Sequence, residues 1–169
     1  MKNIITIFCF WLLCSCMLCG CGVYSFTGAS IDPSVKTFTI HYIKNQAPLV
    51  VPSLSQTMTD ALKNKFLTNS NLNQAENNGD LEFSGVITTY LVTPVAVQAN
   101  ETAALNRLTI SVSIDFINHQ NDKQTWTSTF SRYVDFNSST DFTSIQDQLI
   151  KEISDQLVED IFNKAVVNW

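Results

Sequence analysis

Residues 108 to 116 alternate without interruption between apolar and polar side chains. Leucine, isoleucine, valine, isoleucine and phenylalanine occupy positions 108, 110, 112, 114 and 116, with threonine, serine, serine and aspartate between them. This period of two residues predicts a β-strand with one buried face and one face in contact with water. The chain must therefore build a sheet that is covered on one side, because only such a sheet buries the apolar set.

Three further segments predict strands. Residues 37–44 place Phe38, Ile40 and Tyr42 on one face. A second strand starts at Leu81 and ends near Pro94, because proline has no backbone N–H for a sheet. Its inward set is Leu81, Phe83, Gly85 and Ile87.

The last predicted strand, residues 125–136, contains a local conflict. Trp126, Phe130, Val134 and Phe136 share a parity, but Arg132 falls among them. Two arrangements are compatible with this pattern. Either a β-bulge turns Arg132 outward, or Arg132 shares the apolar face near its rim.

Two segments have helical spacing. One starts at Pro52-Ser53 and runs to about Leu67, with Ser53 and Gln56 as a capping box. Its inward residues are Leu54, Met58, Ala61, Leu62 and Phe66. The other starts near Thr143, with Thr143 and Gln146 as a second capping box. Its inward residues are Ile145, Leu149, Ile153, Leu157, Ile161 and Phe162.

The predicted order is strand, helix, three strands, helix. The last three strands follow one another without an intervening helix, which favours an antiparallel meander, and two amphipathic helices can cover one face of it. We therefore expect an α+β fold, a two-layer sandwich of a four-stranded, mainly antiparallel sheet with both helices on one face.

All five cysteines lie within the first 21 residues. Disulfides confined to that stretch would not connect distant parts of a fold, and no second cluster or nearby histidine supports a zinc site. Instead, Lys2 followed by an apolar run from Ile4 to Leu13 is typical of a signal peptide, since the run is too short to span a bilayer.

The sequence Leu18-Cys19-Gly20-Cys21 resembles a bacterial lipobox, in which the last cysteine is acylated, with palmitate among the usual chains. Leu13-Cys14-Ser15-Cys16 fits nearly as well, so Cys16 stays an alternative. We expect Cys21, because cleavage there leaves no free thiol in an oxidising compartment. Residues 1–20 are then the signal peptide and residues 21–169 a single domain.

The mature chain would have 149 residues, with nine basic and fifteen acidic side chains once Lys2 is removed, hence a net charge of −6. This balance disfavours nucleic-acid partners. Acyl chains would anchor the chain to a membrane. Gly22 stands where an inner-membrane retention signal would place aspartate, so we expect the outer membrane, on its periplasmic side.

Motifs for catalysis, phosphate loops or metal binding are missing from the mature sequence. His41 and His119 are interpreted as ordinary polar positions on a strand and at a hairpin tip. The carboxylates of the last helix are interpreted as a solvated face. We expect no enzyme, no cofactor and no metal.

Five blocks resemble the LptE-type lipopolysaccharide-assembly lipoproteins, in the divergent branch of Bacteroidetes-like bacteria. They are CGVYSFTGASI (21–31), APLVVPSLSQTMTDALKNKF (47–66), GDLEFSGVITTY (79–90), AALNRLTISVSIDF (103–116) and LVEDIFNKAVVNW (157–169). The resemblance implies the two-helix, four-strand fold, no enzymatic activity and a lipidated Cys21. It also implies that the protein is a plug within the lumen of the LptD barrel. The pair of proteins would insert lipopolysaccharide into the outer leaflet.

Arg107 and Arg132 are the only arginines and fall on adjacent predicted strands. Guanidinium groups suit phosphate, so both are candidates for contact with lipopolysaccharide or the barrel. The alternative is ion pairing with Asp115 or Asp135. The connection 94–106 is a candidate barrel contact or an ordinary loop. A lipid-like ligand carrier without a barrel partner is the alternative function.

Overall fold

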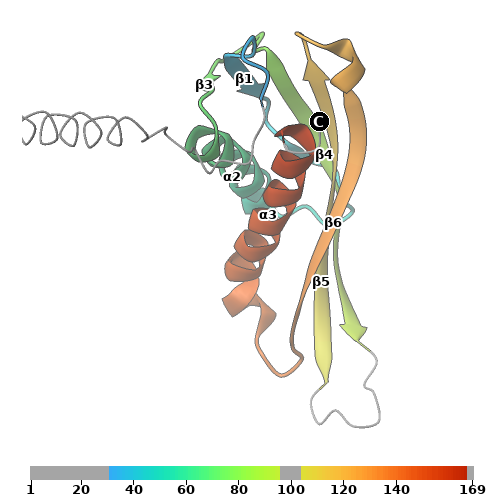
Figure 1. Cartoon of the computed structure of the whole chain (residues 1–169). Helices are drawn as coiled ribbons and strands as arrows, with labels where there is room; N and C mark the ends of the chain where they lie inside the picture. Colours follow the sequence, from blue (N-terminus) through green and yellow to red (C-terminus); the bar gives the residue numbers. More distant parts are fainter. Residues whose placement is uncertain (1–30, 96–103, 167–169) are drawn as a thin grey trace, which may run out of the picture.

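The computed structural model describes residues 31–95 and 104–166, which form a mixed β-sheet with two helices on one of its faces (Figure 1). The elements in chain order are β1 (Thr37–Ile40), β2 (Lys44–Asn45), α2 (Pro52–Asn69), β3 (Asn73–Gln74), β4 (Leu81–Val95), β5 (Leu105–Asn118), the short 3₁₀ helix η2 (Asp122–Gln124), β6 (Trp126–Asn137) and α3 (Phe142–Val166). The predicted α+β sandwich is confirmed. Residues 1–20, Cys16 and Cys21 lie outside the described residues.

The sheet has the strand order β3-β1-β4-β5-β6, and β2 pairs with β4 beyond the end of β1. β4, β5 and β6 form the predicted antiparallel meander. The expected total of four strands is wrong, since the described residues form six. β1 pairs in parallel with both β3 and β4, and β2 pairs in parallel with β4. The chain bends between Ile40 and Lys44, which divides the predicted strand 37–44, and β3 is too short to show a period.

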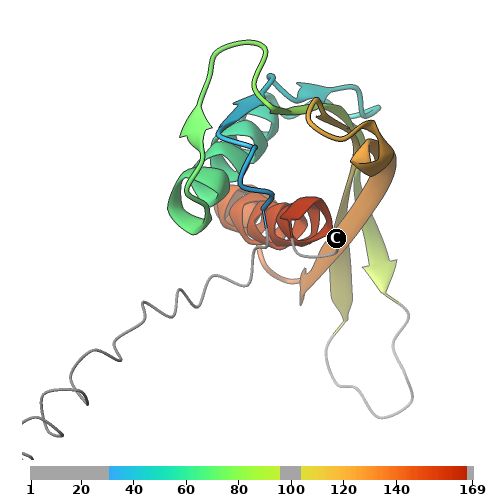
Figure 2. The same cartoon turned by 45° about the horizontal axis from the view of Figure 1, so that its top comes forward.

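The helices lie on one side of the sheet (Figure 2), and the side chains of the core come from the facing surfaces of the two layers. The even-numbered residues of β5 from Leu108 to Phe116 are fully or almost fully buried. Phe66 of α2 contacts the rings of Phe38, Phe83 and Phe162, with centroids 4.8–5.3 Å apart. The inward residues predicted for α3 are buried, apart from the half-buried Ile145. Each large apolar side chain buried in this way contributes about 1.5–3 kcal/mol.

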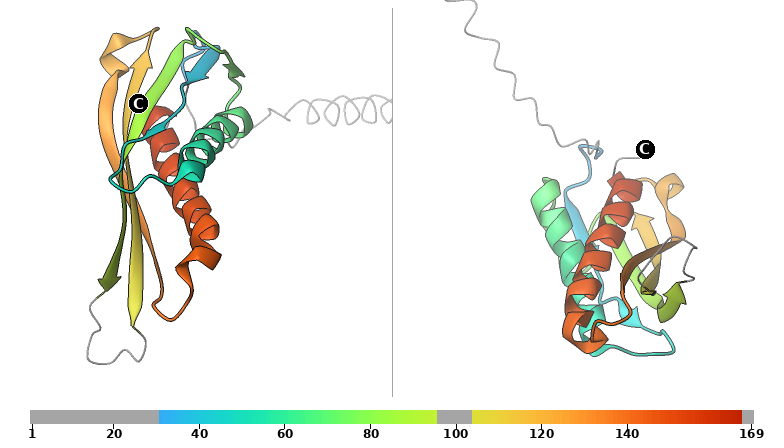
Figure 3. Two further views of the ribbon diagram at one scale, coloured as in Figure 1. Left: turned by 180° about the vertical axis from the view of Figure 1, so that it is seen from behind. Right: turned by 90° about the horizontal axis from the view of Figure 1, so that it is seen from below.

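A β-bulge in β4 changes which side chains face the core. The register with β5 shifts between Ile87 and Thr89, so Tyr90 is buried, although the alternation before the bulge would have placed Thr89 inside. The far ends of β4 and β5, toward Val95 and Leu105, extend past the helical layer (Figure 3). Gly85 lies in the regular part, where an added Cβ would be 2.5 Å from the carbonyl oxygen of Ser113.

Neither predicted capping box forms. α2 begins at Pro52, whose missing N–H needs no cap, and Gln56 donates to Asp60 instead of reaching back to Ser53. At the start of α3, Asp141 Oδ1 accepts the Thr143 N–H at 3.2 Å, while Gln146 donates to the hydroxyl of Tyr90. α2 therefore begins without a side-chain cap, and Asp141 takes the role predicted for Thr143.

The bend between β1 and β2 is held by a buried hydroxyl of α2. The Ile43 N–H donates to Thr59 Oγ1 at 3.1 Å, and Thr59 Oγ1 donates to the carbonyl oxygen of Ser55 at 2.7 Å. Both Ile43 and Thr59 are buried. The Ile43 amide thus has a partner only while Thr59 keeps its hydroxyl.

Replacement Thr59→Val keeps the shape of the side chain but leaves the buried Ile43 N–H without an acceptor. We expect the free energy of unfolding, measured by urea denaturation, to fall by about 1–3 kcal/mol. Thr57→Val is the matched control, since it makes the same change at a half-buried position of the same helix. Equal midpoints for the two variants would contradict this role of Thr59.

Candidate functional site

The sheet face opposite the helices is uncovered by any described element (Figure 1). Its side chains come from the outward positions of the three long strands, which the register aligns in rows across the sheet. Ten of them carry hydroxyl groups and form what we call the hydroxyl face: Ser84, Thr89, Thr93, Thr109, Ser111, Ser113, Thr127, Thr129, Ser131 and Tyr133. All ten are half-buried or exposed.

Hydrogen bonds across the strands order part of this surface. The Ser111 hydroxyl donates to the Ser131 hydroxyl at 2.9 Å, and the Thr127 hydroxyl donates to Asp115 Oδ1 at 2.6 Å. Leu91 and Tyr133 stand in one row on either side of Thr109, and each is 52% exposed. The hydroxyl face is therefore broad, polar and sparsely charged, with an exposed apolar residue at each side of one row.

Arg107 lies on this face, with its guanidinium group between two β6 side chains. Its Nε and Nη2 donate to the two carboxylate oxygens of Asp135 at 2.7 and 2.8 Å, and the guanidinium carbon is 3.6 Å from the ring centroid of Tyr133. The hydrogen bonds to Arg107 lower the pKa of Asp135, and those to Asp135 raise the pKa of Arg107. This ion pair is the one that the sequence offered as an alternative.

Arg132 lies on the opposite face of the sheet. The β5–β6 register runs without a shift through the pair Ile110 and Arg132, so no bulge turns Arg132 outward, and it shares the face with Phe130 and Val134. Its Nε and Nη2 reach the carboxylate of Asp160 on α3, both at 2.6 Å. The structure therefore does not bring the two arginines into one site, and the Asp160 partner was missed from the sequence.

The two histidines meet at one carboxylate. His41 Nε2 lies 2.5 Å from Glu82 Oε1, and His119 Nε2 lies 2.9 Å from Glu82 Oε2. The hydrogen bond from His119, which has the larger effect, and the hydrogen bond from His41 lower the pKa of Glu82. The residues are 37 to 41 positions apart, so no local motif indicated the cluster. In the part of the chain that the structure describes, no three potential ligands are arranged to hold a metal ion.

Asp80 ties together the same end of the sheet. Its carboxylate accepts the backbone N–H groups of Lys36 and Thr37 at 2.8 and 2.9 Å, the Thr37 hydroxyl at 2.9 Å and the Gln120 side-chain amide at 2.7 Å. These bonds, led by that from Lys36, lower the pKa of Asp80 to about 2. The ionised carboxylate therefore joins β1, β4 and the β5–β6 connection.

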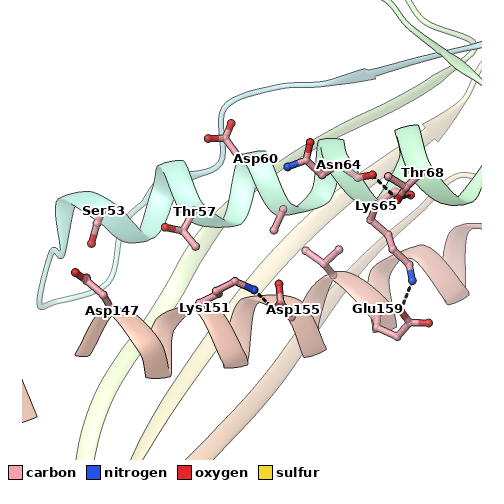
Figure 4. A pocket seen from close by; sticks show the side chains of 12 residues that line it. Ser53, Thr57, Asp60, Asn64, Lys65, Thr68, Asp147, Lys151, Asp155 and Glu159 are labelled. Carbon is pink, nitrogen blue, oxygen red and sulfur yellow. Dashed lines mark hydrogen bonds and ion pairs between the residues drawn. The ribbon is translucent and has the colours of Figure 1, made fainter. Parts of the chain in front are cut away.

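A groove of about 720 Å³ runs between α2 and α3, and most of the residues that line it are polar or charged (Figure 4). Lys65 of α2 reaches across it to Glu159 of α3, and Lys151 pairs with Asp155 at 2.6 Å. Ser53, Thr57 and Asp147 line the opposite end. The α3 carboxylates predicted as a solvated face thus partly form ion pairs.

The model of the LptE lipopolysaccharide-assembly family matches residues 35–165 of the chain. This match spans both helices and the whole described sheet. The chain belongs to the LptE family. This is a non-enzymatic family of membrane-associated lipoproteins that act in lipopolysaccharide assembly, as the sequence blocks implied.

Solved structures support the fold assignment. A minor lipoprotein from Acinetobacter baumannii has a TM-score of 0.53 and 14% identity, over 80% of this chain and 95% of the other. A Xanthomonas campestris protein has a TM-score of 0.51 and 10% identity, over 82% and 90% of the two chains. At these identities the likeness shows the fold alone. No curated protein matches the sequence.

The described helices include none with the length and apolar character needed to cross a bilayer. Cys21 and most of the connection 94–106, namely residues 96–103, lie outside the described residues. Their predicted roles, lipidation and barrel contact, stay predictions.

We expect the stability contributed by Asp80 to depend on pH. Since its pKa is lower in the folded than in the unfolded chain, this contribution is complete above the ordinary value of 3.8 and is lost as the pH falls towards about 2. Urea denaturation from pH 5 to pH 2 of the wild type and of Asp80→Asn measures it. The variant should show a shallower loss of unfolding free energy, and an identical pH profile would contradict the role of Asp80.

Proposed function

We propose that this LptE-family lipoprotein is the plug and assembly partner of an LptD-type outer-membrane barrel. In this role it supports the transport of lipopolysaccharide to the outer leaflet and its insertion there. Cys21 would carry the acyl chains and hold the chain at the periplasmic side of the outer membrane, with the domain in the barrel lumen.

The observation that carries this proposal is the uncovered hydroxyl face. This face carries nine serine and threonine side chains and pairs its single arginine with Asp135, so that Glu82 and Asp115 are its other charged residues. The lumen-facing side of a transmembrane barrel is polar, so a polar surface rich in hydroxyl groups is complementary to it. Neutral hydroxyls can exchange water for barrel side chains at a lower desolvation cost than charges.

Size is compatible with a lumenal position. A single domain of 149 residues has a radius of gyration of about 15 Å. Small barrels are filled by their own side chains, and barrels of about 22 strands leave room for a plug. A partner barrel should therefore belong to the largest class.

The alternative, a carrier of a lipid-like ligand without a barrel, would need a concave apolar pocket. The grooves between α2 and α3 and between β6 and α3 are open, and most of the residues that line them have polar or charged side chains. The core between sheet and helices is filled by large side chains, among them Phe38, Phe66 and Phe83. The described domain therefore supports the barrel partnership better.

Purification of the lipidated protein from outer membranes in mild detergent tests the proposal. We expect a large barrel of LptD type to accompany it in near-equimolar amount, and depletion of the protein to reduce surface lipopolysaccharide. Purification without a barrel, together with normal surface lipopolysaccharide after depletion, would contradict it.

We further propose that Arg107 and Arg132 contact lipopolysaccharide or the barrel from opposite faces of the sheet. The double replacement Arg107→Ala and Arg132→Ala should lower surface lipopolysaccharide, because each guanidinium can bind a phosphate or carboxylate as a fork. Lys36→Ala with Lys123→Ala removes the same charge from exposed positions and is the control. Unchanged export and barrel assembly in the arginine variant would contradict this role.

A further inference from the structure

β6 forms a long edge of the sheet. Its twelve residues pair with β5 on one side, and no described strand pairs with the other side. The Ser138 N–H donates to the carbonyl oxygen of Ala104, the residue that faces it when the register continues one position beyond Leu105 and Asn137. Because hydrogen-bonded pairs alternate along an antiparallel ladder, the even-numbered residues of β6 are the ones whose backbone groups bond to β5. The backbone groups of Thr127, Thr129, Ser131, Tyr133 and Asp135 therefore point away from β5, toward the open edge.

This edge has few of the features by which proteins prevent strand addition. Prolines, lysines and bulges commonly block exposed edges, but β6 contains no proline or lysine and keeps its register with β5 throughout. Arg132, its one inward-pointing charge, is bound by Asp160. An incoming strand would therefore meet a regular row of free donors and acceptors.

A groove of about 670 Å³ lies beside this edge, between β6 and the last turns of α3. Trp126 and Phe130 are half-buried in its wall, and Lys164 Nζ lies 5.0 and 5.9 Å from their ring centroids. Lys164 also donates to the Ser128 hydroxyl at 2.5 Å. With Arg132 and Asp160 in the same wall, the groove has two cations and one carboxylate, so it is positive although the protein is acidic.

We infer that the edge of β6 binds an extended, acidic segment of the barrel partner, which adds as a further strand and directs carboxylates into the groove. Strand addition would supply the affinity through backbone hydrogen bonds, and Lys164 beside the two aromatic rings would select acidic side chains. A second copy of this chain fits less well, because the even-numbered residues of its β6 offer no carboxylate. The inference rests on the proposed function for the identity of the partner.

The backbone part is tested with Thr129→Pro, which removes one outward N–H without removing a hydrogen bond to β5, at a position where edge strands tolerate proline. Thr129→Ala is the matched control, since it changes the side chain and keeps the N–H. We expect Thr129→Pro to reduce the barrel that co-purifies with the lipidated full chain by roughly tenfold relative to Thr129→Ala, since both variants lose the hydroxyl but only the proline variant loses the N–H. Urea denaturation of both variants verifies folding.

The charge part is tested with Lys164→Glu, which keeps the backbone and therefore decides the matter if Thr129→Pro fails to fold. Lys151→Glu makes the same charge change on the solvent side of α3 and is the control. Lys164→Glu should also lower co-purification roughly tenfold, because the groove would then repel carboxylates. A photo-cross-linker at Asn163 should reach an acidic segment of the barrel protein.

Full barrel recovery with folded Thr129→Pro, or with Lys164→Glu, would overturn the inference and leave the proposed function standing. Wild-type protein that brings no barrel with it would overturn both. A cross-link from Asn163 to a segment without acidic residues would also overturn the inference.

Discussion

The structure depends on the pairing of β5 with a strand on each of its sides. β5 pairs with β4 along nearly its whole length and with β6 over twelve positions. Because side chains alternate, this one register buries the residues from Leu108 to Phe116 against the helices and presents Thr109, Ser111 and Ser113 on the opposite face. A slip by one residue would place the hydroxyls in the core, so the core and the hydroxyl face are fixed together.

Elements whose pattern repeats over several turns or pairs could be predicted from the sequence. The three long strands and both helices appear close to their expected positions, because each buries a periodic apolar set. β2 and β3 could not be predicted, since strands of two residues form only when β4 and β1 offer them a partner. The bulge after Ile87 could not be predicted either, because it is a shift in register relative to β5 and the sequence of β4 alone does not contain that register.

The candidate site was predictable only in part. The polar side of β5 followed from the alternation, but the partner of Arg132 is a carboxylate on α3, 28 residues away, and no spacing rule indicates it. Likewise, His41, Glu82 and His119 meet because β1 and β5 flank β4. Contacts that depend on sheet order are determined by topology, which single-strand patterns do not encode.

The two faces of the sheet give the molecule a division of roles. The helix-covered face supplies stability through its aromatic contacts, and the open face supplies a broad surface with few uncompensated charges. Such a surface gains little from contact with nucleic acid, whereas it suits a polar protein wall. Membership of the LptE family gives this surface a natural context in lipopolysaccharide assembly.

The most direct test of this account is photo-cross-linking in cells from two positions of the lipidated protein. Ser113 lies at the centre of the hydroxyl face, and Glu152 lies on the exposed side of α3. The account predicts strong cross-links from position 113 to the wall of a large outer-membrane barrel. No barrel cross-link from position 113, with a clear one from position 152, would contradict it.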